Sequence, residues 1–598
     1  MITEKKLTGY PSIDKPWLKY YKPNVELNQI PHESIFMRLE RCNRKRLDYP
    51  VMEMRTSANR FKRGPIISYR KYFDNIWKCA YALKNIGVKK DDIIPIILPN
   101  VPECRTFIYA VNIIGAVAYP VSPMASVGIL EGIVKDNRVS IVIIFDAFWD
   151  KFSTVFSRQK IDHIIHLNGA ESFSGLVRLV AGLKLSHKTI PHDKSNLNYY
   201  EFISLGKNQK EELLPFYAPN HTAVIVGTSG TTGTSKGVCL SNECLNALAA
   251  AQEEAEIFTA GETTLDALIS SIGYGISMEH SYGCLGVNSI LIPELITDVF
   301  PNLLCLTKPD SFAGGPVHYI NLSKSEEYKN GKLPSVKNLI SGGASLSKDL
   351  EAELNKVNVG YVEKEGDKIL VRQGYGATEC CGSACYQTHG AYKFGGIGIP
   401  FPYVNMGIFK PGTDQELPYG EQGEICVCGQ TVMTGYLNNE EETANVLKMH
   451  SDGKIWLHTA DLGYCDSDGQ FYITDRIKNI FMRTGFNVHP SKIAEFIISL
   501  PEVKDSVVVG IPHPTEQMVP VAFVVLHDPD ANTEIIRERL ITESIHNLSE
   551  TDIPLDWFFV KELPRNMGGK VDVKRLVDES KVDYYKREEK AKEGSYHS

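Results

Sequence analysis

The sequence predicts an α/β fold, with a large N-terminal multi-subdomain α/β domain of mostly parallel sheets and a small C-terminal α+β domain. Helix-like and strand-like segments alternate along the first part of the chain, which is typical of parallel sheets covered by helices. After about Asp475 a shorter unit of strands and two helices follows, about the size of one small domain. With 43% hydrophobic and 23% charged residues, the composition is that of a globular protein.

The earliest clear element is a helix that begins at Tyr69 and stops near Gly87. Its apolar residues, among them Phe73, Ile76 and Leu83, recur at the spacing of one helix face. Gly87 supplies the stop, because glycine commonly ends helices. The alternating pattern of the α/β domain therefore starts here.

Strand and helix patterns then alternate. Strand patterns lie at 91–100, 139–148, 162–168 and 221–227, and a helix-like segment lies at 102–118. The apolar stretch that begins at Phe107 is interrupted by Asn112 and Pro120. These residues favour a buried helix followed by a strand over a membrane span.

The C-terminal unit has its own order of elements. Helix patterns lie at 491–500 and 535–545, and strand patterns at 504–512 and 519–528. We therefore expect two domains, a large one at 1–475 and a small one at 479–598.

Charge and cysteine usage exclude several classes of function. The formal net charge of −8 gives no electrostatic reason to expect a nucleic-acid partner. The first residues are charged and do not resemble a signal peptide, so a cytoplasmic protein is expected. The 13 cysteines are scattered and form no pair of C-x-x-C motifs, which favours reduced, packed thiols over a zinc site.

The stretch VGTSGTTGTSKGVCLS at 226–241 is similar to a phosphate-binding loop but is not a Walker A loop. Ser235 stands where that motif has its second glycine, and Gly237 stands where it has Ser or Thr. Glycines let a backbone approach a polyanion, hydroxyls donate to it, and a lysine adds charge. The candidate phosphate contacts are Thr228, Ser229, Gly230, Thr231, Thr232, Gly233 and Lys236. The alternative is a flexible surface loop, which the apolar strand directly before it disfavours.

Four further segments are difficult to explain by packing: GYGATE at 374–379, and the stretches at 423–438, 456–479 and 564–576. Together with the loop, in this order, they strongly resemble the adenylate-forming superfamily, which contains AMP-forming acyl-CoA synthetases. The resemblance runs from about Ser68 to Leu576. It implies that ATP and Mg²⁺ activate a small-molecule carboxylic acid as an acyl-adenylate, which the thiol of CoA then attacks.

The resemblance also implies roles for single residues. Lys570 bridges the carboxylate and the α-phosphate, Thr378 contacts the α-phosphate, and Glu379 holds Mg²⁺. The adenosine contacts implied are Tyr375, Asp461 and Arg476, with Gly343 and Ala344 of the GGAS turn as a further wall. In the second step the small domain rotates about Lys478, and pantetheine passes Gly485. Alone, Asp461 has a second interpretation as a turn cap, Arg476 as a surface ion pair, and Lys570 as a solvated loop residue.

The acyl group is expected beside Tyr274, Gly342 and Gly374. Amino-acid-activating members of the superfamily usually carry an Asp near the position of Tyr274, and none stands here, so a fatty or aryl acid is expected. The sequence departs from the superfamily pattern at Ser235, Asn242, Asp475, Met482 and Lys492. Two alternatives remain open: an enzyme that loads a carrier protein, and a non-catalytic adenylate-binding protein.

Overall fold

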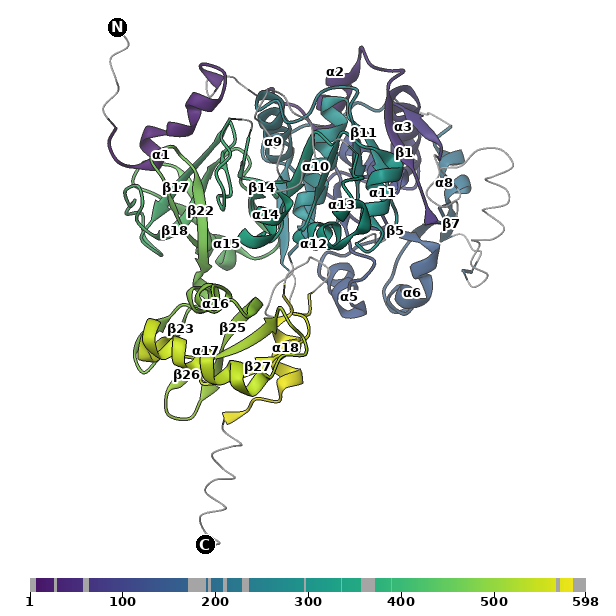
Figure 1. Ribbon diagram of the computed structural model, residues 1–598. Coiled ribbons are helices and arrows are strands. Elements are labelled where there is room, and N and C mark those ends of the chain that lie inside the picture. Colours follow the sequence, from purple (N-terminus) through teal and green to yellow (C-terminus); the bar gives the residue numbers. More distant parts are fainter. Residues whose placement is uncertain are drawn as a thin grey trace.

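The computed structural model describes residues 7–25, 30–57, 64–169, 171, 190–191, 195–207, 212–228, 236–294, 297–334, 336–355, 371–388, 390–565 and 571–584. Within these ranges the strands form four sheets. Three of them belong to the part of the chain before Ile477. Figure 1 shows the fourth sheet and helices α16, α17 and α18 as a separate body below the other three.

The first large sheet has nine strands in the described chain and a parallel centre. Strands β1, β11, β10, β12, β13 and β14 pair in parallel, and antiparallel strands complete both edges. In spatial order the strands are β16 (Ile399–Pro400), β15 (Cys385–Tyr386), β14 (Val371–Tyr375), β13 (Asn338–Ser341), β12 (Ser311–Gly314), β10 (Thr263–Asp266), β11 (Asn288–Leu291), β1 (Pro50–Met54) and β2 (Ile66–Ser68).

The second large sheet has eight strands in the described chain. Six of them pair in parallel, and the hairpin of β8 and β9 with the edge strand β19 is antiparallel. In spatial order the strands are β19 (Gly435–Tyr436), β9 (Gly237–Ser241), β8 (Thr222–Gly227), β4 (Val117–Pro120), β3 (Ile93–Ile97), β5 (Ile141–Phe145), β6 (His163–Leu167) and β7 (Asn196–Asn198).

Helices cover these sheets, and one hydrophobic core contains side chains of both sheets together with those of α3, α4, α9 and α10. The helices of the large part are α1 (Pro11–Asp14), α2 (Ile35–Asn43), α3 (Tyr69–Asn85), α4 (Pro102–Ile114), α5 (Val127–Asp136), α6 (Trp149–Arg158), α8 (Tyr199–Leu205), α9 (Asn242–Glu254), α10 (Gly273–Leu285), α11 (Phe300–Thr307), α12 (Pro316–Lys324), α13 (Glu326–Lys329), α14 (Lys348–Leu354) and α15 (Glu440–Val446). No helix in the described ranges has both the length and the apolar character needed to cross a membrane.

The third sheet is antiparallel, which the sequence patterns did not predict. Its strands are β17 (Val404–Phe409), β18 (Gly423–Gly429), β21 (Ile455–Cys465), β20 (Leu447–Met449) and β22 (Phe471–Arg476). The fourth sheet contains β24 (Phe486–Val488), β23 (Phe481–Arg483), β26 (Gln517–Leu526), β25 (Val503–His513) and β27 (Asp556–Phe559), with helices α16 (Pro490–Ile498), α17 (Thr533–Asn547) and α18 (Val573–Ser580).

The predicted α/β class is confirmed, but the end of one helix needs correction and one helix was not predicted. The helix predicted at 102–118 ends at Ile114, because Gly115 adopts a left-handed conformation with φ 80° and the chain enters β4 at Val117. The small unit contains α18 in addition to the two predicted helices. This helix is eight residues long with Leu576 as its one buried residue, and the sequence analysis did not single it out.

Candidate active site

Thr378 and Glu379 follow directly after the carboxyl end of β14, in the 3-10 helix η5 (Thr378–Cys380). The chain turns between strand and helix at Gly376, where a Cβ atom would lie 2.5 Å from the backbone of Ser383. A side chain cannot be accommodated there, so the turn requires glycine. Both residues thus stand at the edge of a parallel sheet where ligands of α/β proteins commonly bind.

The two ends of the predicted phosphate loop are held together. The N–H of Thr228 donates to the carbonyl of Lys236 over 2.9 Å, directly before β9. Lys236 Nζ forms an ion pair with Glu442 of α15 and lies 5.0 Å from the centroid of the Tyr436 ring. The predicted contacts between these ends lie outside the described residues: Ser229, Gly230, Thr231, Thr232 and Gly233.

Tyr436 connects Lys236 to Glu379. Its hydroxyl donates to Glu379 Oε1 at 2.8 Å. Burial and the neighbouring Glu379 carboxylate raise the pKa of Tyr436, so the hydroxyl keeps its proton and remains a donor. The sequence analysis did not single out Tyr436 or Glu442. The available signal was the position of Tyr436 in the segment at 423–438.

Asp461, Tyr375 and Arg476 form one polar group, in which Asp461 and Tyr375 are buried and Arg476 is exposed. The Tyr375 hydroxyl donates to Asp461 Oδ2 at 2.8 Å, and Arg476 Nε lies 2.6 Å from Asp461 Oδ1. The side chain of Asp461 is 4% exposed, whereas that of Arg476 is 54% exposed. Asp461 of β21 and Arg476 of β22 are directly opposite each other in the antiparallel pair that these two strands form. Because Tyr375 ends β14, the group lies next to Thr378 and Glu379 along the chain.

The three residues expected around the acyl group line one cavity. Its empty volume, which includes space open to solvent, is about 370 Å³. The ring of Tyr274 approaches to 3.2 Å of the place where a Cβ of Gly342 would lie. The lining residues are Gln252, Ile257, Phe258, Tyr274, Met278, Ile340, Gly342, Gly343, Gly374, Gly382, Ser383, Cys385, Tyr386 and Phe401. Ala344 follows Gly343 in the GGAS turn after β13.

The cavity and the polar residues after β14 meet at Gly273. This glycine begins α10, directly before Tyr274, and a Cβ on it would lie 2.8 Å from Thr378 Cα and 2.9 Å from Thr378 Oγ1. Thr378 therefore packs against the first turn of the helix that lines the cavity. Thr378 is thus connected to the cavity through Gly273 and the lining residue Tyr274.

Of the three residues predicted to act at the hinge or in the small domain, the structure describes Lys478 and Gly485. Lys478 lies in the 3-10 helix η6 (Ile477–Asn479), between the third and fourth sheets. Gly485 joins β23 to β24 with φ 87°, and no atom lies within 4 Å of where its Cβ would be. Lys570 lies outside the described residues. Arg565 and Val571, the described residues on either side of the undescribed range, form an isolated antiparallel bridge.

Two departures from the superfamily pattern have structural explanations. Asn242 is fully buried, and its Oδ1 accepts hydrogen bonds from Ile35 N at 3.0 Å and Asn112 Nδ2 at 2.9 Å. It therefore joins three helices of the core. Asp475 Oδ2 accepts from the hydroxyl of Ser491 at 2.6 Å, which ties β22 to α16 across the junction.

The other departures remain without such an account. Met482 is 47% exposed on β23, and Lys492 is exposed near the start of α16. Ser235 lies outside the described residues. Nothing in the structure explains these three substitutions.

Comparisons with known proteins identify the family. The AMP-binding enzyme model matches residues 39–437, and the AMP-binding enzyme C-terminal domain matches 492–570. The chain is 30% identical over 594 residues to a long-chain-fatty-acid–CoA ligase of Bacillus subtilis, covering 96% of this chain and 99% of that protein. It is 26% identical to 4-coumarate–CoA ligase 4 of Arabidopsis thaliana, with 85% of each covered.

A solved structure has the same fold. ATP-bound MatB from Rhodopseudomonas palustris superposes with a TM-score of 0.73 at 23% identity, covering 92% of this chain and all of that one. The fold, the order of the motifs and both family matches agree. The chain therefore belongs to the AMP-binding enzyme family, as an acyl-CoA-synthetase-like member of the adenylate-forming superfamily.

Proposed function

We propose that this enzyme uses ATP to convert a carboxylic acid into an acyl-adenylate with release of pyrophosphate, and then transfers the acyl group to the thiol of CoA, releasing AMP. One observation carries the proposal. Thr378 is packed on Gly273, directly before the cavity-lining Tyr274, and follows β14, whose last residue, Tyr375, donates a hydrogen bond to Asp461. An acid in the cavity and a nucleotide at Asp461 would thus meet at Thr378.

The first step needs positive charge and hydrogen-bond donors where the carboxylate approaches the α-phosphate. Thr378 would donate to that phosphate, and Lys570 would bridge it to the carboxylate. Lys236 would neutralise charge on the β- and γ-phosphates, together with donors of the loop 228–233. Fixed donors of this kind stabilise developing charge without reorganisation, which is usually the largest catalytic contribution.

Mg²⁺ fits the side chains at this place, because it prefers oxygen ligands and is commonly held by one or two carboxylates and substrate phosphates. Glu379 provides a carboxylate whose Oε1 is oriented by the Tyr436 hydroxyl. Bound there, the ion would offset phosphate charge. Tyr436 would keep the Glu379 carboxylate directed at it.

The nucleoside would be held by Asp461, with its oxygens directed at the ribose hydroxyls. Tyr375 would lie against adenine while its hydroxyl orients Asp461, and Arg476 would make a second ribose contact. Gly343 and Ala344 would form another wall. In the second step the small domain would turn about Lys478, and the pantetheine arm would pass Gly485, where a side chain would narrow the path.

The acid is a fatty or aryl acid. Apolar side chains form much of the cavity lining, and no carboxylate is among the lining residues of the described chain that could hold an α-amino group. The names of relatives that act on a long-chain fatty acid and on 4-coumarate support the same class. We place the reaction in the cytoplasm, with small molecules as partners and no nucleic acid.

Two variants separate the half-reactions. Lys570→Ala is expected to slow adenylate formation about 10²- to 10³-fold, as loss of one transition-state donor does. Gly485→Leu is expected to block thioester formation while adenylate formation continues. The measurements are pyrophosphate release without CoA and acyl-CoA formation by mass spectrometry. Equal loss of both steps in Gly485→Leu would contradict the assigned CoA path.

The alternative acceptor is the pantetheine of a carrier protein. Adenylate formation with no acceleration by CoA, but with acylation of an added carrier protein, would establish it. Absence of ATP turnover with every fatty, aryl and amino acid tested would instead support a non-catalytic adenylate-binding protein.

A further inference from the structure

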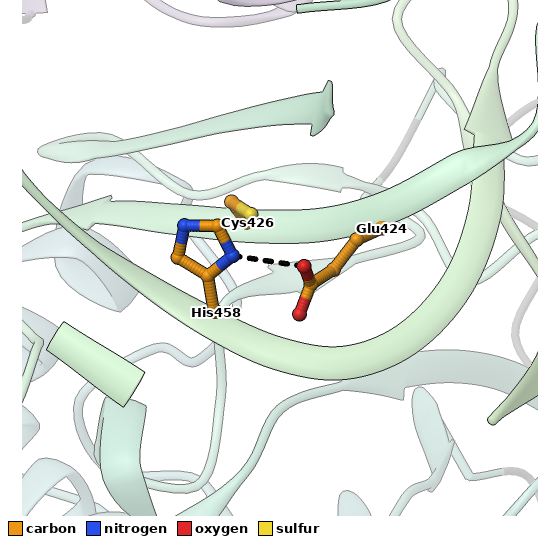
Figure 2. A group of neighbouring side chains, drawn as sticks. All are labelled: Glu424, Cys426 and His458. Atoms are coloured by element: carbon orange, nitrogen blue, oxygen red, sulfur yellow. Dashed lines mark hydrogen bonds and ion pairs between the residues drawn. The ribbon is translucent and has the colours of Figure 1, made fainter. Parts of the chain in front are cut away.

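A buried polar cluster lies on the face of the third sheet, apart from the groups described above. Glu424 and Cys426 come from β18 and His458 from β21, and Figure 2 shows the three side chains together. Their ligand-type atoms lie within 4.8 Å of one another. Carboxylate, thiol and imidazole are all groups that can bind metal ions. The hydrogen bonds of the cluster decide whether it serves that role.

The polar atoms of the cluster are already engaged with one another. His458 Nδ1 lies 2.8 Å from Glu424 Oε2, and His458 Nε2 lies 2.9 Å from His450 Nε2. Because a carboxylate only accepts, His458 Nδ1 is the donor to Glu424, and the Nε2 atoms of His458 and His450 share one hydrogen bond. Burial raises the pKa of the Cys426 thiol, which favours the protonated form that does not ligate metals. A hydrogen-bond network explains these contacts better than a metal site.

Glu424 also binds backbone N–H groups. Its Oε1 accepts from Ala460 at 3.0 Å, and its Oε2 accepts from Gly412 at 3.2 Å. Burial by itself would raise the pKa of Glu424, but the hydrogen bonds from His458 and these N–H groups lower it below the usual range. The carboxylate is therefore ionised and acts as a fixed acceptor.

The residue that Glu424 holds is the one directly before Asp461. Ala460 has φ 58°, a left-handed conformation that is unfavourable for a residue with a Cβ. Here β21 bulges, since Glu424 pairs with Leu462 but Cys426 pairs with His458, leaving 459–461 opposite one residue. Bulges of this kind re-aim side chains next to active sites.

A second contact holds the same bulge. The hydroxyl of Thr459 donates to the carbonyl of Ile425 at 2.7 Å and accepts from the N–H of Asp461 at 3.1 Å. Two adjacent residues of β18 therefore bind the bulge, one through a side chain and one through its backbone. The backbone of Asp461 is fixed from this side, while Tyr375 and Arg476 fix its carboxylate.

We propose that Glu424, oriented by His458 and His450 and assisted by Thr459, is a positioning residue that fixes Asp461 for the ribose hydroxyls of ATP. The inference rests on the proposed role of Asp461. The two hydrogen bonds from the ribose hydroxyls to the Asp461 carboxylate depend on the exact position of that carboxylate. Loss of the contacts that hold the bulge should therefore weaken recognition of the ribose more than binding of the rest of the nucleotide. The network does not touch the acyl cavity.

The test compares two nucleotides. Dissociation constants of ATP and 2′,3′-dideoxy-ATP, both with Mg²⁺, are measured by calorimetry for the wild type, Asp461→Ala, Glu424→Ala, Thr459→Val and Cys426→Ala. The wild type is expected to prefer ATP about 10- to 100-fold, as hydrogen bonds to a carboxylate require. Glu424→Ala loses most of this preference and binds the dideoxy analogue within about twofold of wild type. A general structural defect would weaken both nucleotides equally.

Cys426→Ala is the matched control, because it lies in the same cluster but does not hold the bulge, and it should keep the preference. Thr459→Val is nearly isosteric and half-buried, so it tests the same anchor if Glu424→Ala does not fold, and it should lower the preference several-fold. If a folded Glu424→Ala or Thr459→Val variant keeps the full preference for ATP over the dideoxy analogue, while Asp461→Ala loses it, the positioning role of Glu424 is wrong. The proposed role of Asp461 would still stand in that case. No preference in the wild type would instead contradict the proposed role of Asp461. Stoichiometric zinc in the purified enzyme, lost in Cys426→Ala, would show a metal site and overturn the network.

Discussion

Arg476 and Asp461 face each other across the paired strands β21 and β22, with 2.6 Å between Arg476 Nε and Asp461 Oδ1. Arg476 is also the last residue of β22, directly before the 3-10 helix that contains Lys478. The group proposed to hold ribose is therefore joined to the junction of the two parts of the chain. If the small domain turns about Lys478, the pivot lies two positions after Arg476, which is a proposed nucleotide contact.

Loss of the two partners should have unequal effects. Asp461→Asn is expected to raise the KM for ATP at least tenfold, because a buried carboxylate that accepts two ribose hydroxyls is removed. Arg476→Ala should raise it only about two- to fivefold, since half-exposed ion pairs contribute little. Initial rates of adenylate formation against ATP concentration measure both. An equal, large effect of the two variants would contradict this division of roles.

Glu379 and Tyr436 predict a change in metal dependence. Glu379→Gln removes the charge proposed to bind Mg²⁺ and should shift half-maximal activity to at least tenfold higher Mg²⁺, whereas Tyr436→Phe removes only one orienting hydrogen bond and should shift it about two- to tenfold. Titration of Mg²⁺ at saturating ATP checks both shifts. An unchanged Mg²⁺ profile in Glu379→Gln would remove Glu379 from the metal site.

The contact between Gly273 and Thr378 predicts that no side chain is tolerated there. In Gly273→Ala the new Cβ would lie 2.8 Å from Thr378 Cα, so Thr378 must move, at a cost of about 1–3 kcal/mol in stability. We expect at least a tenfold loss of kcat for adenylate formation, by analogy with the loss of one donor.

Gly283→Ala is the control for this prediction. It lies in the same helix, and its Cβ would lie 2.9 Å from the end of the buried Leu39 side chain and 3.7 Å from the Tyr109 hydroxyl, with no atom of Thr378 within 4 Å. Its kcat should stay within about twofold of wild type, since distant packing changes rarely reach the chemistry. Equal losses of kcat in the two variants would show that the effect is not specific to Thr378.

Glu279 predicts a pH dependence of stability. Burial raises its pKa to about 7, with Arg105 opposing the shift and Asp266 adding to it. Between its unfolded pKa of 4.5 and about 7, the folded protein holds a proton that the unfolded chain has released, so this group's stabilisation falls as pH rises through that window. Glu279→Gln lacks this titration. The melting temperature of the wild type relative to Glu279→Gln should therefore decrease from pH 5 to pH 8, and a constant difference would contradict the raised pKa.

Elements that carry a local pattern could be predicted from the sequence. The helix from Tyr69 ends at Asn85 as α3, and the apolar run TAVIVG is β8, because periodicity and apolar runs are local properties. The antiparallel third sheet was not predicted, since strand order depends on contacts between distant segments. The register of β18 with β21 is an example.

In the site, too, residues in local motifs could be predicted, whereas contacts between distant segments could not. Tyr375, Thr378, Glu379 and Asp461 stand in motifs that could be recognised in the sequence, and their roles stay predictions. Tyr436 could not be assigned, because its role comes from a contact with Glu379, 57 positions away in the chain. The hydrogen bond between Glu424 and Ala460 likewise depends on a bulge that no local pattern predicts.

The central claim is the two-step reaction, and acid-dependent exchange of labelled pyrophosphate into ATP tests it most directly, followed by AMP release with and without CoA. The account predicts exchange with fatty or aryl acids, none with amino acids, and AMP release that CoA accelerates. AMP release that CoA leaves unchanged would contradict transfer to CoA. Absence of exchange with every acid would contradict adenylate formation itself.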